Sequence, residues 1–216
     1  MKKKGLFSRN VPGTTEILRK TCVGIAGCGG LGSNAAVSLV RSGVGKLILA
    51  DFDTVEESNL NRQYYFQSDV GKKKIEALSC HLKSINPEVQ LETADMQLTP
   101  SHIARVFSEA DILIEAFDRA ESKSWLIEAW STAFPERHVI CASGISGIGD
   151  VESIKVRHQR NIHVVGDETS DMGAGLCAAR VAVAANMEAH VAIELLTKRY
   201  QGACGRQEGY VNSTVS

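Results

Sequence analysis

The feature that most constrains this chain is a glycine-rich turn, GCGGLG at residues 27–32, which lies between two different hydrophobic patterns. The residues before it, 21–26 (TCVGIA), are apolar and partly β-branched, as in a buried strand, and the residues after it have helical spacing. Gly27, Gly29 and Gly32 fill a GxGxxG pattern, in which glycine permits a tight turn and lets the backbone approach a phosphate. Together with Gly30 and the free N–H groups of the helix start, they are predicted to bind nucleotide phosphates.

A second apolar run, residues 46–50 (KLILA), ends at Asp51 and completes a strand–turn–helix–strand unit. At the end of the second strand of such a unit, a carboxylate can accept hydrogen bonds from ribose hydroxyls. We therefore expect Asp51 to bind the ribose of a nucleotide whose phosphates lie on the glycine turn. The alternative interpretation of the glycines is a tight turn that holds no ligand.

The rest of the chain continues to alternate between strand and helix patterns. Strand patterns occur at residues 89–93, 111–116 and 138–142, and helical patterns at residues 72–85, 100–108 and 120–132. This alternation predicts an α/β fold of the Rossmann type, with a doubly wound, mostly parallel sheet and helices on both faces. Residues 150–157 and 161–165 predict an antiparallel hairpin, and residues 175–200 predict a long Ala-rich helix.

This pattern indicates one nucleotide-binding domain. We expect it to cover residues 21–200, after an N-terminal arm of residues 1–20 and before a flexible tail of residues 201–216. No internal repeat or Pro/Ser-rich linker divides the chain.

Basic residues distinguish between the possible nucleotides. Arg62 follows the second strand, and its planar guanidinium can clamp phosphate oxygens. Positive charge is unfavourable at a helix N-terminus, so Lys72, Lys73 and Lys74 at the start of a predicted helix suggest that an anion offsets the cost. These residues favour ATP over NAD, because a nicotinamide enzyme needs no cluster of cations at its phosphates. The alternatives are a surface ion pair for Arg62 and a solvated helix start for the lysines.

A carboxylate follows the strand pattern of residues 111–116. Asp118 lies at the predicted carboxyl edge of the sheet, where doubly wound folds bind ligands. A carboxylate at this place can hold Mg²⁺ on the phosphates of ATP. The alternative role for Asp118, compatible with the first, is an N-cap for the helix predicted from Ala120.

The composition limits the classes of function. Hydrophobic residues make up 44% of the 216 residues, as in a globular protein, and the formal net charge is −1. This charge balance gives no support to nucleic-acid binding. No apolar run is long enough to cross a bilayer, and the N-terminus lacks a signal-peptide pattern, so we expect a cytoplasmic protein without membrane contact.

The six cysteines form no Cys-x-x-Cys pair, and this spacing argues against structural zinc. We therefore predict no zinc site. In a cytoplasmic protein the thiols are expected to be reduced and to act mostly as small core residues.

Five blocks of the sequence, in this order, resemble the ThiF/MoeB/HesA family, whose adenylation fold is shared with ubiquitin-activating enzymes. The blocks are GCGGLGS, ADFDTVEESNLNRQ, GKKK, INPEV and EAFDRAESK. The resemblance covers residues 5–200 approximately, and the short length and LFSRN start are most similar to compact ThiF-type sulfur carrier protein adenylyltransferases of thiamine biosynthesis. It implies ATP-dependent adenylylation of the C-terminal glycine carboxylate of a small ubiquitin-like sulfur carrier protein ending in Gly-Gly, with release of pyrophosphate.

The resemblance also implies roles for individual residues. Gly29 would lie in the phosphate loop and Asp51 would bind ribose, with Asp53 of the same DFD segment also contacting the nucleotide. Asn59, Arg62 and Lys74 would bind the triphosphate with Gln63 nearby, and Asp118 would hold Mg²⁺. Family members are homodimers in which an N-terminal arginine enters the partner's site, and Arg9 is the best match here. Arg9, Arg62, Lys74 and Asp118 would then carry catalysis, since an ionised carboxylate needs no side-chain base to attack ATP.

The chain departs from the family pattern in two places. Many members carry two Cys-x-x-Cys pairs that bind zinc, and this chain has none. Many also carry a cysteine just before the glycine that opens the last long helix, where this chain has TSDM at residues 169–172. Cys177 falls two residues past Gly175, inside the predicted helix, where a core thiol is favoured over a covalent catalytic role.

Two other functions stay open at this point. A tRNA threonylcarbamoyladenosine dehydratase-like enzyme has the same fold and adenylates a small carboxylate, although the neutral charge balance weighs against tRNA. An NAD-dependent oxidoreductase or nucleotide-binding sensor would explain the glycines and Asp51. It would leave Arg62, Lys74 and Asp118 without a joint role.

Overall fold

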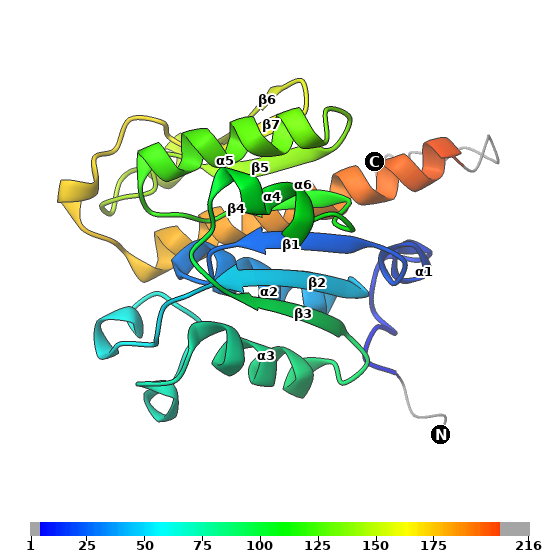
Figure 1. The fold of residues 1–216 in the computed structure, drawn as a ribbon, viewed down its shortest axis with the longest axis horizontal. Helices are drawn as coiled ribbons and strands as arrows, with labels where there is room; N and C mark the ends of the chain where they lie inside the picture. The colour runs from blue at the N-terminus through cyan, green and yellow to red at the C-terminus, as the bar shows by residue number, and fades with distance from the viewer. Residues whose placement is uncertain (1–4, 204–216) are drawn as a thin grey trace, which may run out of the picture.

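The computed structural model describes residues 5–203, apart from the side chains of Met172 and of residues 199–203. Its centre is a seven-stranded sheet with the order β3-β2-β1-β4-β5-β7-β6 (Figure 1). The strands are β1 (Cys22–Ala26), β2 (Lys46–Asp51), β3 (Gln90–Asp95), β4 (Ile112–Glu115), β5 (His138–Ala142), β6 (Lys155–Gln159) and β7 (Ile162–Gly166). All pairings are parallel except that of β6 with β7. The predicted doubly wound sheet with a C-terminal antiparallel pair is confirmed.

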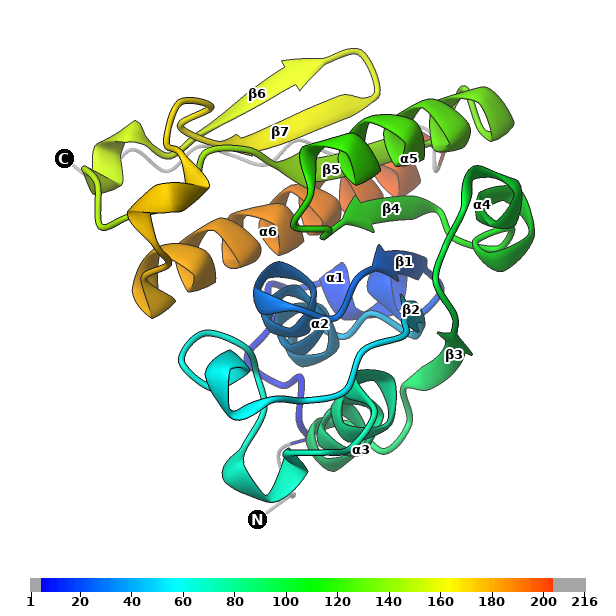
Figure 2. The same cartoon turned by 60° about the vertical axis from the view of Figure 1, so that its left-hand side comes forward.

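Helices cover both faces of the sheet (Figures 1 and 2). They are α1 (Thr14–Leu18), α2 (Gly30–Ser42), α3 (Lys74–Ile85), α4 (Pro100–Val106), α5 (Ala120–Ala133) and α6 (Ala178–Ala203), with short 3-10 turns η1 (Glu57–Asn59), η2 (Gln67–Asp69), η3 (Val151–Ser153) and η4 (Met172–Ala174). α2, α3 and α6 share one hydrophobic core with the sheet, and α4 and α5 share the other. No helix in the described part of the chain has the length and apolar character needed to cross a membrane.

The sequence of the central strand β1, CVGIA, fits its buried position. All five residues of β1 are buried. A Cβ on Gly24 would lie 2.7 Å from Cδ1 of Phe107, so glycine here makes room for a fully buried aromatic ring. β1 pairs with β2 on one side and β4 on the other. The chain winds away from β1 in both directions, which leaves a crevice at the carboxyl ends of β1 and β4.

Helix α2 begins at that crevice, and glycines mark both of its ends. It begins at Gly30, immediately after the glycine turn, and its C-cap is Gly43 with a φ of +102°. The N–H of Gly43 donates to the carbonyl of Leu39 at 3.1 Å, which ends the helix in a left-handed cap. The free N–H groups of the first turn of α2 therefore lie at the carboxyl edge of the sheet.

The C-terminal elements differ from the prediction at three boundaries. Residues 151–153 form η3 instead of a strand, because Asp150 Oδ1 accepts the N–H of Glu152 at 3.0 Å and closes a local turn. α6 begins at Ala178, since Gly175 has a φ of +74° and cannot belong to a right-handed helix. α6 also extends to Ala203, and the remainder of the predicted tail lies outside the described residues.

Candidate functional site

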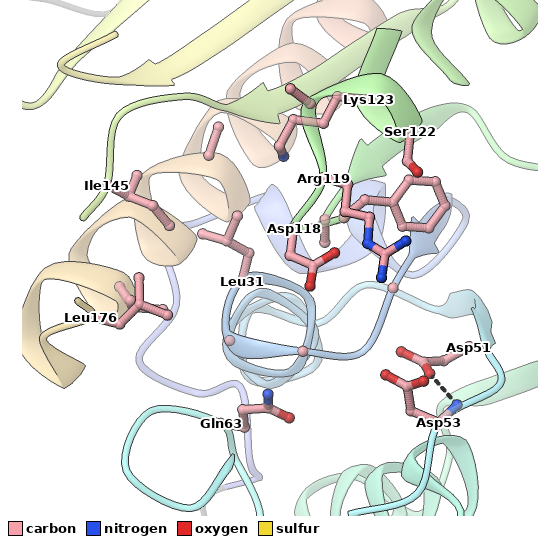
Figure 3. A pocket seen from close by; sticks show the side chains of 18 of the residues that line it. Leu31, Asp51, Asp53, Gln63, Asp118, Arg119, Ser122, Lys123, Ile145 and Leu176 are labelled. Carbon is pink, nitrogen blue, oxygen red and sulfur yellow. Dashed lines mark hydrogen bonds between the residues drawn. The ribbon is translucent and has the colours of Figure 1, made fainter. Parts of the chain in front are cut away.

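A cavity of about 750 Å³ opens at the carboxyl edge of the sheet, at the crevice between β1 and β4. One side, which we call the glycine-loop wall, consists of residues 27, 29–31, 50–53, 62, 63 and 74. Across the cavity lies the crossover wall, which consists of residues 142–146, 170, 171 and 176 (Figure 3). Residues 116–120 and 122–123 also line the cavity, and among them Asp118 lies between the two walls in Figure 3. This is the place where doubly wound folds bind their ligands.

The glycine loop joins β1 to α2 by a close contact within its own backbone. A Cβ on Gly32 would lie 1.9 Å from the carbonyl oxygen of Gly27, so only glycine lets the helix pack onto the turn. Gly27, which has a φ of +99°, lines the cavity with Gly29 and Gly30, whereas Gly32 does not. The first turn of α2 faces the cavity directly behind this loop, with N–H groups and a positive dipole end suited to an anion.

Asp51 ends β2 beside the glycine loop, and its carboxylate is fixed by two backbone groups. Oδ2 accepts the N–H of Cys28 at 2.6 Å and Oδ1 accepts the N–H of Asp53 at 2.8 Å (Figure 3). Each carboxylate oxygen can accept a further hydrogen bond. Asp51 is thus held at the cavity in a position where it can accept hydrogen bonds from ribose hydroxyls.

The three lysines at the start of α3 each pair with an aspartate of the same chain. The Nζ–Oδ distances are 3.2 Å for Lys72–Asp69, 3.1 Å for Lys73–Asp95 and 2.7 Å for Lys74–Asp53. The anions that offset the lysine charges are therefore carboxylates of the chain itself. Lys74 and Asp53 line the cavity, whereas the other two pairs do not.

Arg62 and Gln63 also lie on the glycine-loop wall. Nη1 of Arg62 donates to the carbonyl of Ser58 at 3.2 Å and to Oδ1 of Asn61 at 2.8 Å, which holds the half-buried guanidinium at the wall. Oε1 of Gln63 is buried and has no hydrogen-bond partner among the described residues. This oxygen therefore lacks the hydrogen bond that a buried acceptor normally has.

Asn59 is not brought to the cavity with the other predicted residues. Its Oδ1 accepts the N–H of Glu56 at 3.1 Å, and this hydrogen bond closes the turn η1. In this structure Asn59 shapes the loop that carries Arg62.

Asp118 lies in the loop between β4 and α5, exposed at the cavity. The alternative role as helix N-cap is wrong, because the N-cap of α5 is Arg119. Within residues 5–203 no group donates a hydrogen bond to the Asp118 carboxylate, and no cluster of three metal-ligating side chains occurs. A single carboxylate suits Mg²⁺, which takes its other ligands from phosphates and water.

A buried acid and a lysine beside Asp118 were missed by the sequence analysis. Glu115, at the end of β4, is fully buried, and its Oε2 accepts a hydrogen bond from Nζ of Lys123 at 2.9 Å. Burial raises the pKa of Glu115, and the Lys123 ammonium opposes this. Both residues belong to the EAFDRAESK block, but the irregular spacing of its charges gives no signal that they pair.

Another buried carboxylate, Glu188 of α6, lies close enough to Lys123 and Glu115 for their charges to act on it. Neither of its oxygens has a hydrogen-bond partner among the described residues. Burial raises the pKa of Glu188 well above its ordinary value.

Apolar side chains complete the cavity next to Asp51. They are Phe52, Met96, Leu98, Phe117 and Trp125. The rings of Phe117 and Trp125 lie 5.7 Å apart between centroids. Flat apolar surfaces of this kind suit a purine base. Met96 and Leu98 come from the connection between β3 and α4, which has no periodic pattern that could have predicted their place.

Arg9 is exposed and does not line the cavity of its own chain. The neighbouring Asn10 donates to the carbonyl of Ser42 at 2.9 Å, at the C-terminal end of α2. α2 has 13 residues, so this end lies about 20 Å from the glycine loop. The expected role of Arg9 concerns a partner's site and stays a prediction.

The cysteines divide into buried and more accessible thiols. Cys22, Cys28 and Cys141 are buried, and burial raises the pKa of Cys22 and of Cys141 to about 12. Cys177 is half-buried and lies directly before α6 instead of inside it, where its carbonyl accepts the N–H of Val181 at 3.0 Å. The raised pKa values make the thiols of Cys22 and Cys141 poor nucleophiles.

A family model described as the ThiF family matches residues 6–214. The chain belongs to the ThiF family. It is 42% identical over 90 residues to ubiquitin-like modifier-activating enzyme 5 of Drosophila ananassae and 46% identical over 84 residues to that of Dictyostelium discoideum. These matches cover 42% and 39% of this ThiF-family chain but 23% and 22% of the relatives, so less than a quarter of the length of either relative is matched.

Solved structures show the same fold over nearly the whole chain. The tRNA N6-threonylcarbamoyladenosine dehydratase TcdA of E. coli in complex with AMP has a TM-score of 0.76 and 22% identity, covering 89% of this chain and 91% of its own. MccB of E. coli with ATP has a TM-score of 0.73 and 24% identity, covering 91% of this chain and 64% of its own. At these identities the likeness concerns the fold of the ThiF-family chain and not its substrate.

Proposed function

We propose that this ThiF-family protein is an ATP-dependent adenylyltransferase that activates the C-terminal carboxylate of a small ubiquitin-like protein. The observation that carries the proposal is that Arg62, Lys74 and Asp118 line one cavity together with the glycine loop and Asp51. A dehydrogenase of the same fold would use the loop and Asp51 but would leave the three charged residues without a joint role. Relatives that are ubiquitin-like modifier-activating enzymes support a protein acceptor.

In the proposed reaction the acceptor carboxylate attacks the α-phosphorus of ATP, the bond to pyrophosphate breaks, and an acyl-adenylate forms. The attacking group is already ionised, so the chain needs to position two anions and reduce the repulsion between them. Arg62, Lys74 and the N–H groups of the glycine loop would hold the phosphates, and Asp51 would hold the ribose. Asp118 would hold Mg²⁺, which when bound would neutralise further phosphate charge.

The finer proposal is that the acceptor is a sulfur carrier protein ending in Gly-Gly, as in thiamine biosynthesis. Four of the five residues at 142–146 (ASGIS) of the crossover wall are small, which supports room there for the backbone of such a tail. We further propose that the protein works in the cytoplasm as a homodimer in which Arg9 enters the partner's cavity. Sedimentation should then give a dimer, and Arg9→Ala should lower activity without weakening the dimer.

Two measurements test the proposal. Calorimetry should show binding of Mg-ATP and none of NAD, and tight binding of NAD would overturn the assignment. Radiolabelled pyrophosphate should exchange into ATP only when a sulfur carrier with a free Gly-Gly carboxylate is present. The same carrier with one added C-terminal residue is the matched control, and exchange with it or without any carrier would contradict a protein acceptor.

A second candidate function is a tRNA threonylcarbamoyladenosine dehydratase-like reaction. The fold shared with TcdA over 89% of this chain fits it equally well. In that case modified tRNA, and not a carrier protein, should drive nucleotide turnover. Incubation with Mg-ATP and modified tRNA, followed by analysis of the nucleosides, separates the two candidates.

A further inference from the structure

The crossover wall is built from two connections that have little regular structure. Residues 143–154 join β5 to β6 and residues 167–177 join β7 to α6, at the end of the sheet where α6 begins (Figure 2). They are joined to each other by hydrogen bonds such as Gly147 N–H to the carbonyl of Gly175 at 2.7 Å and Ser146 N–H to Ser170 Oγ at 3.1 Å. The shape of this wall therefore depends on what fixes the two connections.

One ion pair reaches both connections. Arg180, in the first turn of α6, has a side chain only 3% exposed, and its Nη2 donates to Oδ2 of Asp167 at 2.6 Å. Its Nη1 donates to the carbonyls of Ile148 at 3.4 Å and Asp150 at 3.3 Å. The guanidinium thus ties α6 to the first connection through backbone carbonyls and to the second through Asp167.

Asp167 continues the link toward the cavity. Its Oδ1 accepts the N–H groups of Thr169 at 2.8 Å and Ser170 at 2.7 Å. Ser170 lines the cavity and also accepts the N–H of Ser146 from the opposite connection. A continuous set of hydrogen bonds therefore runs from Arg180 to the cavity surface.

Glycines occur where the backbone meets each end of the pair. A Cβ on Gly149 would lie 2.6 Å from Nη1 of Arg180, and a Cβ on Gly144 would lie 2.1 Å from Oδ1 of Asp167. Both glycines have positive φ, at +53° and +72°. The first connection, which contains both glycines, thus follows a path that only glycine permits at its contacts with the pair.

Stability alone explains this arrangement poorly. Removing two charges from water costs about as much as their attraction returns, so a buried ion pair adds little net stability. It does select one arrangement of the groups around it, because leaving either charge buried without its partner is unfavourable. Nε of Arg180 is buried without a partner among the described residues, which adds to the cost.

We propose that Arg180 and Asp167 are positioning residues that set the crossover wall to receive the extended C-terminal tail of the protein acceptor. This inference rests on the proposed function. The pair touches neither the glycine loop nor the residues that would bind ATP, so disturbing it should weaken acceptor use and leave ATP binding unchanged.

Arg180→Lys keeps the positive charge but cannot bind Asp167 and the carbonyls of the first connection at the same time. Gly149→Ala places a methyl group against the guanidinium of Arg180. Both should raise KM for a Gly-Gly sulfur carrier in pyrophosphate exchange by about tenfold to a hundredfold, since small displacements at a reacting site are costly. Kd for ATP and kcat at saturating carrier should change less than about twofold. Arg157→Gln is the matched control. It breaks the exposed ion pair between Arg157 of β6 and Glu168, the residue that follows Asp167 in the second connection.

Hydrogen–deuterium exchange gives a measurement that does not require activity. Arg180→Lys should raise deuterium uptake in residues 144–153 and 167–176 and leave residues 27–33 unchanged. If the wild type shows no carrier-dependent exchange, the proposed function fails, and uptake alone then decides whether the pair sets the wall. Unchanged uptake, or KM for the carrier unchanged while Tm falls, would overturn the proposal.

Discussion

The ammonium of Lys74 lies 2.7 Å from Oδ2 of Asp53, and the two side chains differ sharply in exposure, at 8% and 47%. The backbone N–H of Lys74 also donates to the carbonyl of Asp53 at 3.0 Å. Both the backbone and the side chain of Lys74 therefore fix the start of α3 to Asp53, two residues after the end of β2. A buried lysine held in this way cannot swing freely to meet a ligand. A phosphate that reaches Lys74 must therefore share its ammonium with Asp53, within the geometry that Asp53 sets.

Lys74→Met should lower pyrophosphate exchange by about a hundredfold to a thousandfold, the usual cost of removing a preorganised group that stabilises charge. Lys73→Met is the matched control, because Lys73 is the preceding residue and pairs with Asp95 outside the cavity. The control should stay within about twofold of wild type, the range of exposed pairs. Equal losses of exchange in both variants would mean that the loss comes from removing any positive charge at the start of α3, and not from a specific role of Lys74 in the cavity.

Asp118→Asn should remove most of the exchange and raise the Mg²⁺ concentration needed for half-maximal rate, because an amide is a weaker ligand for a hard cation. Glu121→Gln changes an exposed acid in the next turn and should leave both values unchanged. Arg62→Ala should lower exchange by about a hundredfold or more. Circular dichroism should be unchanged in all three variants, and full activity of Asp118→Asn would show that the metal ligand is elsewhere.

Asp51→Ala should mainly weaken ATP binding, since ribose contacts are similar in the ground and transition states. The variant also removes the acceptor of the Cys28 and Asp53 N–H groups, so part of the loss should come from the loop itself. Asp51→Asn retains one side-chain oxygen acceptor and should lose less. Calorimetry on both variants measures this order, and a fall in kcat with Kd for ATP unchanged would contradict it.

Glu188→Gln should stabilise the protein more as the pH rises. Burial raises the pKa of Glu188 well above its ordinary 4.5, the nearby Glu115 raises it further, and Lys123 lowers it. The folded chain thus binds this proton more tightly than the unfolded chain, and ionisation lowers the free energy of unfolding as pH increases above the ordinary value. Glutamine cannot ionise, so the gain over wild type should be small near pH 4 and about 1 kcal/mol or more near pH 8.

Urea unfolding at several pH values measures the effect of Glu188→Gln. Glu194→Gln is the control on the same helix, where a hydrogen bond from Lys198 lowers the pKa of an exposed carboxyl. Its stability should not rise with pH relative to wild type. A Glu188→Gln curve parallel to wild type would show that the carboxyl ionises as readily in the folded chain as in the unfolded one.

Local pattern was sufficient to predict the elements that carry the glycine loop and Asp51. The contrast between a buried strand and an amphipathic helix around GCGGLG defines the loop, and the structure confirms the parallel sheet that follows from it. The family was also predicted correctly, because the DFD and SNLNRQ segments are specific. The sequence pattern did not show that the amide of Asn59 closes η1, and the expected contact of Asn59 with the triphosphate stays a prediction.

Contacts between distant segments could not be predicted in the same way. The sequence analysis gave Lys123 no role, yet this residue meets Glu115 across the loop that carries Asp118. Arg180 appears in sequence as one more polar residue of an Ala-rich helix, and its partner Asp167 lies in a loop with no pattern of its own. Such pairs become visible only when the sheet brings both connections to one edge.

The two walls of the cavity come from different stretches of the chain: the glycine-loop wall ends at Lys74, and the crossover wall begins at Ala142. Mutations can therefore alter one wall without touching the sequence of the other. Under the proposed function, a lineage of such proteins could keep its nucleotide chemistry while it acquires new acceptors through changes in the later stretch alone. Chimaeras that exchange residues 142–177 between relatives would then inherit acceptor choice from the donor of that segment.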